Sequence, residues 1–414
     1  MKLLTGRLFW LATSVLYMSC NDASKQDQAK LDSTATTPVK GTYAYDADFL
    51  KKHTTGVVEL KSPDGNSKVL LSSAYQGRVM TSTATGDSGS SYGWLNYDLI
   101  AAREKKKQFN PVGGEERFWM GPEGGQYSIY FKGRDSFSFA NWQVPAFIDT
   151  ESYEVKGSGT SEVLFSRKAT FINYSGTSFD INIERKINLL DAEKAAGILN
   201  TRIPAGLQFV GYQTSNRVEN GGNNDWSRDK GLLSIWLLGM FTPSPKTVVI
   251  IPFHGGPGAR SYITDSYFGQ IPAERLQVKD SILYFTCDGK YRSKIGLSPL
   301  IAKPIAGSFD FEKNILTILV PAVNKDASYV NSKWELQKEP YKGDVINSYN
   351  DGPLADGSQM GPFYEIESSS PALLLKKGQS GEYKQSTFHF QGNYNSLKQL
   401  AQQLLGVNLD EIKR

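Results

Sequence analysis

The sequence predicts an all-β protein whose antiparallel strands pack as a sandwich or a barrel. Apolar and polar residues alternate with period two along much of the chain, most clearly over residues 179–189, and this alternation marks half-buried strands. Turn-forming residues separate the strand candidates, such as Pro-Asp-Gly at 63–65 and Asn-Gly-Gly at 220–222. Helical spacing is rare, so alternating βα units are not expected.

The strand candidates are rich in β-branched and aromatic residues, which suit a pleated and half-buried surface. They cover residues 56–61, 69–73, 127–132, 136–142, 163–174, 179–189, 233–238, 247–252, 282–287, 314–320 and 387–391. No fixed-period repeat and no evident linker divides residues 42–414. Because all-β domains can be large, we expect a single domain over this range.

Two helices are predicted. The first covers Tyr97–Lys106 and follows Asn96, a residue type that often caps a helix. The second covers Tyr394–Leu405, where four leucines recur at helical spacing and Gly406 suits a C-terminal stop. The second helix would close the domain near its C-terminus.

Residues 1–19 have the pattern of a bacterial signal peptide. Lys2 and Arg7 supply the positive charge, and the apolar run over 8–18 is too short to remain as a membrane anchor. The run ends just before Cys20 in a pattern similar to a lipobox, although Tyr17 stands where such motifs usually carry Leu. We expect lipidation of Cys20. Ordinary cleavage beside an incidental cysteine is the alternative.

The segment 20–41 is polar and poor in large apolar groups, so it cannot bury enough surface to fold. It is predicted to be a disordered tether between the lipid on Cys20 and the folded domain. The expected location is therefore the bacterial cell envelope, on the periplasmic or the surface face. The lipid anchor would be the only contact with a membrane.

Charge and composition exclude several classes of partner. The chain has 46 Lys and Arg residues against 42 Asp and Glu residues, and the two signs are interspersed. It therefore lacks the clustered basic patch that nucleic-acid binding needs. Its three histidines lie far apart in sequence, and no metal-binding spacing occurs. We expect no nucleic-acid partner, no metal, no cofactor and a monomeric state.

Two further features have mainly structural interpretations. Cys287 has no intramolecular partner if Cys20 is lipidated, so we expect it to be a small buried residue. His254 opens the run His-Gly-Gly-Pro-Gly after an apolar strand, which resembles the oxyanion loop of proline-iminopeptidase-type hydrolases. No G-x-S-x-G turn follows, so the run is predicted to be a glycine-rich connection between strands.

Three segments combine glycine or proline with aromatic rings and with carboxylates or amides. They cover residues 92–97, residues 113–125, and residues 349–352 together with 361–371. Aromatic faces stack on the C–H faces of sugars, while carboxylates and amides bind the hydroxyl groups. Together the segments predict a carbohydrate as the ligand. For each residue alone, a core aromatic or a loop charge is the alternative.

These segments resemble the galactose-mutarotase-like (aldose 1-epimerase-like) superfamily, and within it a group of exported bacterial lipoproteins. Residues 93–97 are similar to the stretch that opens the mutarotase sugar site, and residues 113–125 to the loop that follows it. Residues 210–236 look like the central region. Residues 365–367 (Glu-Ile-Glu) are similar to the C-terminal strand that carries the general-base glutamate.

The resemblance spans roughly residues 50–392 and implies a supersandwich. In such a fold, large antiparallel sheets pack face to face and a concave sheet face binds the sugar. The resemblance also implies the candidate site. Its candidate catalytic residues are Glu365, Glu367 and Glu116. Its candidate substrate-binding residues are Asn96, Arg117, Trp119, Glu123, Trp94, Trp236, His254 and Asp351.

Glu365 and Glu367 are two residues apart, so a regular strand would point both side chains to one face. The sequence leaves open which of the two carboxyl groups faces the sugar. Mutarotases place a histidine acid opposite their glutamate base. The matching positions here hold Glu115 or Glu116 in one segment and no histidine in the central one. A carboxylic acid could replace the imidazole if burial raised its pKa.

The sequence therefore supports three hypotheses and leaves open whether the chain is an enzyme. In the first, an envelope-anchored lipoprotein binds a carbohydrate, with or without modifying it. In the second, it is an aldose 1-epimerase whose carboxyl groups replace the histidine acid. In the third, it is a non-catalytic lipoprotein that is a subunit of an envelope complex.

Overall fold

The structure is a computed structural model that describes residues 38–412. The predictions for the signal peptide, Cys20 and most of the tether lie outside the described residues. In the described part of the chain, no helix is long and apolar enough to cross a membrane.

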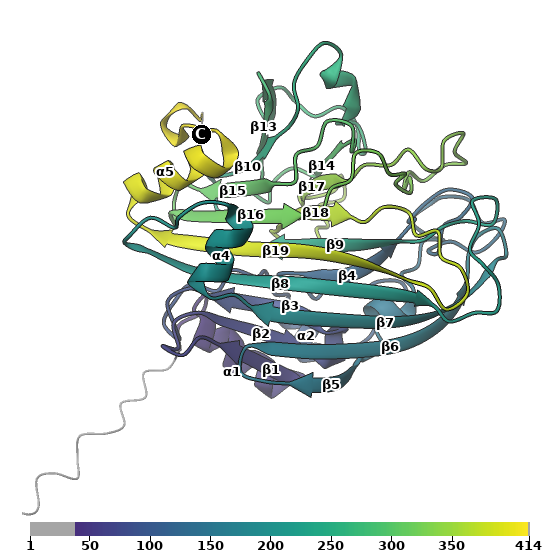
Figure 1. Cartoon of the computed structure of the whole chain (residues 1–414), viewed down its shortest axis with the longest axis horizontal. Helices are drawn as coiled ribbons and strands as arrows, with labels where there is room; N and C mark the ends of the chain where they lie inside the picture. Colours follow the sequence, from purple (N-terminus) through teal and green to yellow (C-terminus); the bar gives the residue numbers. More distant parts are fainter. Residues whose placement is uncertain (1–37, 413–414) are drawn as a thin grey trace, which may run out of the picture. The chain divides into compact units, whose positions relative to one another are not determined.

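The largest layer is a ten-stranded antiparallel sheet with the order β12-β13-β10-β15-β16-β19-β8-β7-β6-β5 (Figure 1). The longest neighbouring pair, β8 and β19, shares thirteen paired positions from Leu207 to Glu219. The strands of this sheet are β5 (Glu154–Ser158), β6 (Glu162–Ile172), β7 (Ser178–Leu189), β8 (Leu207–Asn220), β10 (Thr247–Pro252), β12 (Leu276–Lys279), β13 (Ile282–Thr286), β15 (Ala306–Asp310), β16 (Ile315–Pro321) and β19 (Ser380–Gly392).

Two smaller antiparallel sheets complete the β-structure. The six-stranded sheet has the order β11-β14-β17-β18-β9-β4, and the three-stranded sheet has the order β1-β2-β3. An isolated bridge between Val79 and Glu116 joins β3 to the start of β4. The strands are β1 (Val57–Lys61), β2 (Lys68–Ser72), β3 (Arg78–Thr83), β4 (Arg117–Gly121), β9 (Ser234–Phe241), β11 (Ile263–Thr264), β14 (Ser293–Leu297), β17 (Ile346–Asn350) and β18 (Tyr364–Ser369).

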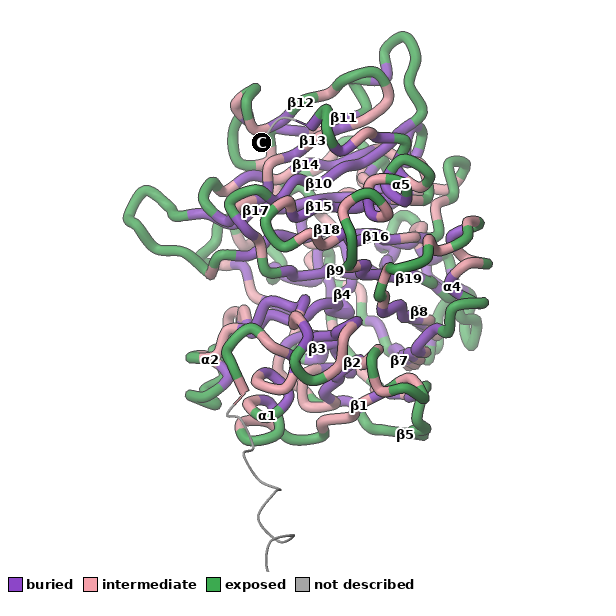
Figure 2. Tube along the Cα trace, turned by 90° about the vertical axis from the view of Figure 1, so that its left-hand side faces the viewer, coloured by how far each residue is buried: buried purple, intermediate pink, exposed green. Residues whose placement is uncertain are grey.

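Helices cover the surfaces that the sheets leave open. Helices α4 (Ala192–Leu199) and α5 (Tyr394–Leu405) pack apolar residues against one face of the ten-stranded sheet, and Figure 1 shows α4 crossing in front of β19. Helices α1 (Tyr43–His53) and α2 (Tyr97–Ala102) pack on the three-stranded sheet. A short helix, α3 (Ala146–Asp149), follows the loop after β4. Figure 2 shows that buried residues follow the strands, whereas exposed residues lie mainly in the loops.

The six-stranded sheet packs one face against the ten-stranded sheet, and polar contacts identify that face. Glu116 forms an ion pair with Arg185 of β7 at 2.9 Å and accepts a hydrogen bond from Gln385 of β19 at 2.9 Å. Ser368 of β18 donates to the same Gln385, at 2.6 Å. Since alternate strand residues point to opposite sides, Arg117 and Glu367 lie on the other face. We call that other face of the six-stranded sheet the site face.

The all-β prediction is confirmed, as is the prediction of large antiparallel sheets packed face to face with a short C-terminal helix. The helix at Tyr394–Leu405 and the strand at Thr247–Pro252 have the predicted bounds. Cys287 is fully buried, as expected, and burial raises the pKa of its thiol. The other predicted helix begins at Tyr97 but ends at Ala102, where the left-handed Arg103 caps it.

The predicted strands at 127–132 and 136–142 are wrong, because both segments are turns within one long loop. Hydrogen bonds within the loop hold it: Ser128 Oγ accepts from Tyr130 N–H at 3.0 Å, and the Asn141 amide donates to the Ser136 carbonyl at 3.1 Å. The aromatic residues that favoured strands instead pack into a cluster, in which the rings of Tyr130 and Trp142 stack at 6.0 Å. The loop therefore contributes side chains to a core without contributing a strand.

The buried Glu116–Arg185 pair predicts a specific stability loss. Glu116→Gln removes one charge and leaves Arg185 uncompensated in the interior, so unfolding should become easier by about 3–5 kcal/mol. The matched control is Glu162→Gln on β6, which breaks an exposed pair with Lys186, the neighbour of Arg185 on β7, and should cost about 1 kcal/mol or less. Urea unfolding measures both values. Equal losses in the two variants would contradict this account of the interface.

Candidate functional site

Charged side chains from three strands and an indole from a fourth meet on the site face. Arg117 of β4 forms an ion pair with Glu365 of β18. Lys294 of β14 forms an ion pair with Glu367 of β18 at 3.0 Å, and the indole N–H of Trp236 on β9 donates to the same carboxylate at 3.0 Å. Both glutamates thus lie on one face, as their spacing predicts. Each carboxyl group has its own cationic partner.

Two loops add to this site. Residues 122–145 follow β4, and residues 322–345 precede β17. Hydrogen bonds join the loops: the backbone N–H of Glu123 donates to Ser332 Oγ at 3.2 Å, and the Gln126 amide donates to the Gln337 carbonyl at 2.9 Å. A side chain at Gly124 would come within 2.2 Å of a backbone oxygen of Lys333, so only glycine permits this approach. The contacts fix the half-buried Glu123 beside the charged residues.

Aromatic rings surround the charges. The rings of Trp119 and Trp236 meet edge to face at 5.6 Å, and each carries a cation: Arg117 lies 4.9 Å from the centre of Trp119, and Lys294 lies 5.0 Å from that of Trp236. These distances fall within the range of cation–π attraction. The loops contribute the remaining rings, which are Tyr130, Trp142 and Trp334. We call the charged residues Arg117, Glu123, Lys294, Glu365 and Glu367 the charge cluster.

The charge cluster contains three carboxyl groups and two cations, so it carries one excess negative charge when every group is ionised. Burial raises the pKa of Glu123 to about 7; Lys294 opposes the shift and Glu367 adds to it. Burial and Glu367 likewise raise the pKa of Glu365 to about 8 against the opposing effect of Arg117. Burial alone would lower the pKa of Lys294, but the three glutamates outweigh it and raise that pKa. The cluster therefore holds a proton near neutral pH.

Some buried polar atoms on the site face have no hydrogen-bond partner among the described residues. They are Arg117 Nε, Trp119 Nε1 and Ser234 Oγ. Ser234 pairs with Gly121 across the β4–β9 ladder, and Trp119 pairs with Trp236 two residues further along. Buried polar atoms usually find partners, and unpaired ones are costly. These groups are therefore suited to bind the oxygen atoms of a polar ligand.

The arrangement is chemically suited to proton transfer. A carboxyl group that retains its proton near neutral pH lies beside a carboxylate that can accept one, which is the requirement for general acid–base catalysis. In residues 38–412, no group of three or more His, Cys, Asp or Glu side chains is arranged to hold a metal ion.

Five of the predicted substrate-binding and catalytic residues lie with Lys294 in this site: Arg117, Trp119, Trp236, Glu365 and Glu367. Glu123 joins them from the loop after β4. Glu116 does not, because it points to the opposite side of the sheet toward Arg185.

Other predicted residues lie apart from the charge cluster. Asn96 caps α2 and accepts a hydrogen bond from the N–H of Leu99 at 3.1 Å. Trp94 packs on Phe363 at 4.8 Å, and both Trp94 and Asn96 line a separate pocket of about 720 Å³. Asp351 is buried and accepts a hydrogen bond from the Tyr349 hydroxyl at 2.6 Å. The ring of Tyr349 packs with Trp94 and Phe363 in one apolar cluster. This group borders the site through the pairing of Tyr349 with Glu365.

His254 lies in the exposed loop after β10, which belongs to the ten-stranded sheet. The glycine-rich run that begins at His254 connects strands, as expected. The structure does not bring the His254 side chain to the charge cluster. A buried histidine, His389 of β19, meets Glu115 at 2.8 Å and Thr317 at 2.9 Å between the sheets. Neither residue supplies an imidazole to the site face.

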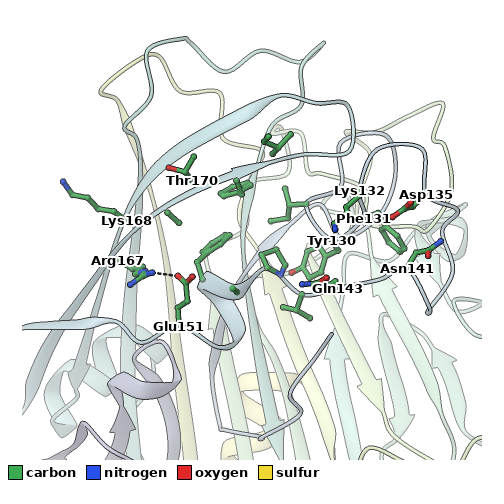
Figure 3. A pocket seen from close by; sticks show the side chains of 18 of the residues that line it. Tyr130, Phe131, Lys132, Asp135, Asn141, Gln143, Glu151, Arg167, Lys168 and Thr170 are labelled. Carbon is green, nitrogen blue, oxygen red and sulfur yellow. Dashed lines mark hydrogen bonds and ion pairs between the residues drawn. The ribbon is translucent and has the colours of Figure 1, made fainter. Parts of the chain in front are cut away.

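A second pocket of about 540 Å³ lies on the far side of the Tyr130 ring, between the 122–145 loop and β6 (Figure 3). Figure 3 shows the ion pair of Arg167 with Glu151 at one end of the pocket; the side chains of Asp135 and Asn141 lie at the other end. Because Tyr130 also packs on Trp119 and Trp142, this pocket shares an aromatic wall with the site.

Sequence reasoning missed Lys294, Trp142 and Trp334. Lys294 alternates with the apolar Ile295 in β14, a short strand that has only five residues and no flanking motif. Trp142 was assigned to a strand, and Trp334 lies in a loop with no recognisable pattern. Their positions depend on contacts between distant segments, such as the 5.9 Å stacking of Trp142 on Trp334.

A family model described as "Family of unknown function (DUF6786)" matches residues 41–414. A search of the curated proteins finds no match to this chain.

The chain is similar to a number of solved structures at low sequence identity. The Slr1438 protein from Synechocystis sp. PCC 6803 is 11% identical, with 81% of this chain and 96% of that chain covered and a TM-score of 0.47. A galactose mutarotase-like protein from Lactobacillus casei ATCC 334 is 11% identical, with 81% and 100% covered and a TM-score of 0.45. A galactose mutarotase related enzyme from Lactobacillus acidophilus is 10% identical, with 86% and 100% covered and a TM-score of 0.44.

The raised pKa of Glu123 predicts a loss of stability as pH rises. The ordinary value is 4.5 and the folded value is about 7, so between these pH values the unfolded state binds fewer protons and is favoured by increasing pH. The loss due to this group should be about 2–3 kcal/mol. Urea unfolding measured at pH 4.5 and at about pH 7 should show this loss of stability in the wild type, and the Glu123→Gln variant should lack it.

The control for this measurement is Glu335→Gln, an exposed residue of the 322–345 loop that should retain the wild-type pH dependence. If the Glu123→Gln curve kept the wild-type slope, Glu123 would not hold the proton.

Proposed function

We propose that this chain, which belongs to the DUF6786 family, binds a carbohydrate on the site face of its six-stranded sheet. The single observation that carries the proposal is the meeting of paired charges, unpaired polar atoms and tryptophan rings at one place. A sugar has hydroxyl groups that can both donate and accept hydrogen bonds, and it has apolar C–H faces. Each of these features has a matching group in the site.

The polar groups match the hydroxyl groups of a sugar. Arg117 Nε and Trp119 Nε1 are donors without a partner in the described residues, so they can donate to hydroxyl oxygens. The carboxyl groups of Glu365 and Glu367 can accept hydrogen bonds from hydroxyl hydrogens. Because these side chains are held by ion pairs between strands of the same sheet, they need little reorganisation to bind a ligand.

The free-energy cost of burying the charge cluster also favours a role in binding a polar ligand. Buried ion pairs are often no better for stability than well-packed apolar residues. The side chains of Arg117 and Glu365 are only 3% and 8% exposed, and that of Glu367 is fully buried. A protein that used this face only for packing or for an apolar partner would not require five charged residues there. A polar ligand explains them.

The proposal includes the location of the protein. The signal-peptide and lipobox patterns of residues 1–20 support export and attachment through a lipid on Cys20. The sugar-binding domain would then be held at the bacterial cell envelope, on the periplasmic or the surface face.

Calorimetric titration of the full chain with a panel of monosaccharides and oligosaccharides tests the binding function. At least one sugar should bind, and Lys294→Met should weaken the binding by about tenfold or more, because Glu367 loses the ion-pair partner that holds it in position. Lys342→Met, which removes an exposed cation paired with Glu339, is the matched control and should leave the affinity unchanged. The absence of heat for every sugar, with thermal unfolding intact, would refute the proposal.

A second candidate function is aldose 1-epimerase activity, which one observation favours. Glu365 has a pKa of about 8, so it can donate a proton at neutral pH, while the nearby Glu367 is a carboxylate paired with Lys294. In this reaction one group takes the proton of the anomeric hydroxyl and another protonates the ring oxygen, so that the ring opens and can close on either face. Carboxyl groups would then fill the role of the absent histidine.

The epimerase candidate predicts faster mutarotation of a pure sugar anomer, followed by optical rotation. Glu365→Gln should slow the catalysed rate by about a hundredfold or more, because the amide cannot transfer the proton. Glu382→Gln, an exposed substitution on β19, should not change it. A rate equal to that of buffer alone for the wild-type protein would exclude this activity for the sugars tested.

A further inference from the structure

Glu123 differs from the other two carboxyl groups of the charge cluster. Glu365 has Arg117 as its ion-pair partner, and Glu367 has Lys294. Within the described residues, no Lys, Arg or His nitrogen forms an ion pair with Glu123. It also lies at the more accessible side of the cluster, since it is half-buried whereas Glu367 is fully buried. The site therefore offers one carboxyl group whose charge is not matched by a cation of its own.

Aromatic rings line the surroundings of this carboxyl group. The indoles of Trp142 and Trp334 interact with the Glu123 side chain, and the two rings stack at 5.9 Å. Tyr130 stacks on Trp142 at 6.0 Å, and its hydroxyl is held by the Met120 carbonyl at 2.8 Å. The indole N–H edges are directed at the Glu123 carboxyl group, so the rings exclude water around it while its charge stays without a cationic partner. Such a carboxylate can bind an organic cation through an ion pair.

The net charge of the whole charge cluster also favours a cationic ligand. With two cations and three carboxyl groups, the cluster reaches neutrality either by retaining a proton or by binding one positive charge. A ligand with an ammonium group would supply that charge and allow all three carboxyl groups to ionise. An anionic sugar, such as a uronic acid, would instead add a second excess negative charge in a largely buried place. A neutral sugar would leave the proton where it is.

Other groups near Glu123 do not remove this preference. The titratable side chains that face it are Lys294 of β14, Glu367 of β18 and Tyr130 of its own loop. Lys294 is already engaged with Glu367 at 3.0 Å, and the pKa of the Tyr130 hydroxyl is raised by burial, so this phenol stays neutral. Arg117 is engaged with Glu365. An incoming cation would therefore not displace an existing partner of Glu123.

We propose that the sugar bound on the site face is an amino sugar with a free ammonium group, which lies beside Glu123 against the rings of Trp142 and Trp334. This inference rests on the proposed carbohydrate-binding function and specifies its ligand class. The hydroxyl groups of the sugar accept hydrogen bonds from Arg117 Nε and Trp119 Nε1. Binding of the ammonium group releases the proton that the cluster otherwise holds.

Calorimetry of the full chain with four probes tests the inference: glucosamine, N-acetylglucosamine, glucose and glucuronic acid. Glucosamine should bind about tenfold or more tightly than N-acetylglucosamine, whose nitrogen carries no charge, and glucuronic acid should bind most weakly. Titration at about pH 6.5 in two buffers of different ionisation enthalpy should show proton release on glucosamine binding, because capture of the cation is linked to ionisation of the protonated carboxyl groups of the charge cluster. N-acetylglucosamine should show no such release.

Glu123→Gln identifies the residue responsible. It should reduce the glucosamine affinity to that of the neutral sugars and abolish the proton release. Glu335→Gln, in the same pair of loops but exposed, is the matched control and should behave as the wild type. The wild-type probe series and its proton count are independent of whether the Glu123 variant folds.

The outcomes separate this inference from the function on which it rests. If neutral sugars bind and glucosamine binds no more tightly, the ammonium preference is overturned and the carbohydrate-binding function stands. If none of the four probes nor any sugar of the wider panel binds, both fail. If glucosamine is preferred but Glu123→Gln leaves the preference intact, the assignment to Glu123 is overturned.

Discussion

The structure depends on the alternation of side chains at the start of β4. Glu116 points between the sheets and binds Arg185 and Gln385 of the ten-stranded sheet, whereas the next residue, Arg117, points to the site face and binds Glu365. Two adjacent residues thus serve the packing of the sandwich and the construction of the site. A register shift of one residue would exchange them and would leave a charge unpaired on both sides. The position of the site and the packing of the sheets are therefore fixed by the same register.

The same alternation explains how β18 contributes. Tyr364, Ile366 and Ser368 face the interior, where Tyr364 and Ser368 hydrogen-bond to the ten-stranded sheet. Glu365 and Glu367 face the other way and are each neutralised by a cation from a different strand. Strand residues can place such pairs with little freedom, because the ladders on both sides hold the backbone. This rigidity suits a site in which proton affinity depends on the spacing of charges.

The sequence was sufficient to predict the class of fold and part of the site, and the limits have physical causes. Period-two alternation identified the long strands such as β7, and the two-residue spacing of Glu365 and Glu367 predicted their common face, because both signals are local. The pairing of Lys294 with Glu367 joins residues 73 positions apart in a sheet whose order cannot be read from local patterns. Aromatic residues at 127–142 suggested strands because β-propensity reflects partial burial, which a packed loop provides equally well.

The loops over the site face have a consequence for how this fold could diversify. Glu123, Trp142 and Trp334 belong to the 122–145 and 322–345 loops, while Arg117, Lys294 and the two strand glutamates belong to the sheet. The joined loops contact each other through a few hydrogen bonds, a glycine and the stacking of Trp142 on Trp334, not through a ladder of strand hydrogen bonds. Insertions and substitutions are tolerated best in such segments. Relatives of this chain could therefore change the group they select at Glu123 by exchanging loop residues, while inheriting the strand charges unaltered.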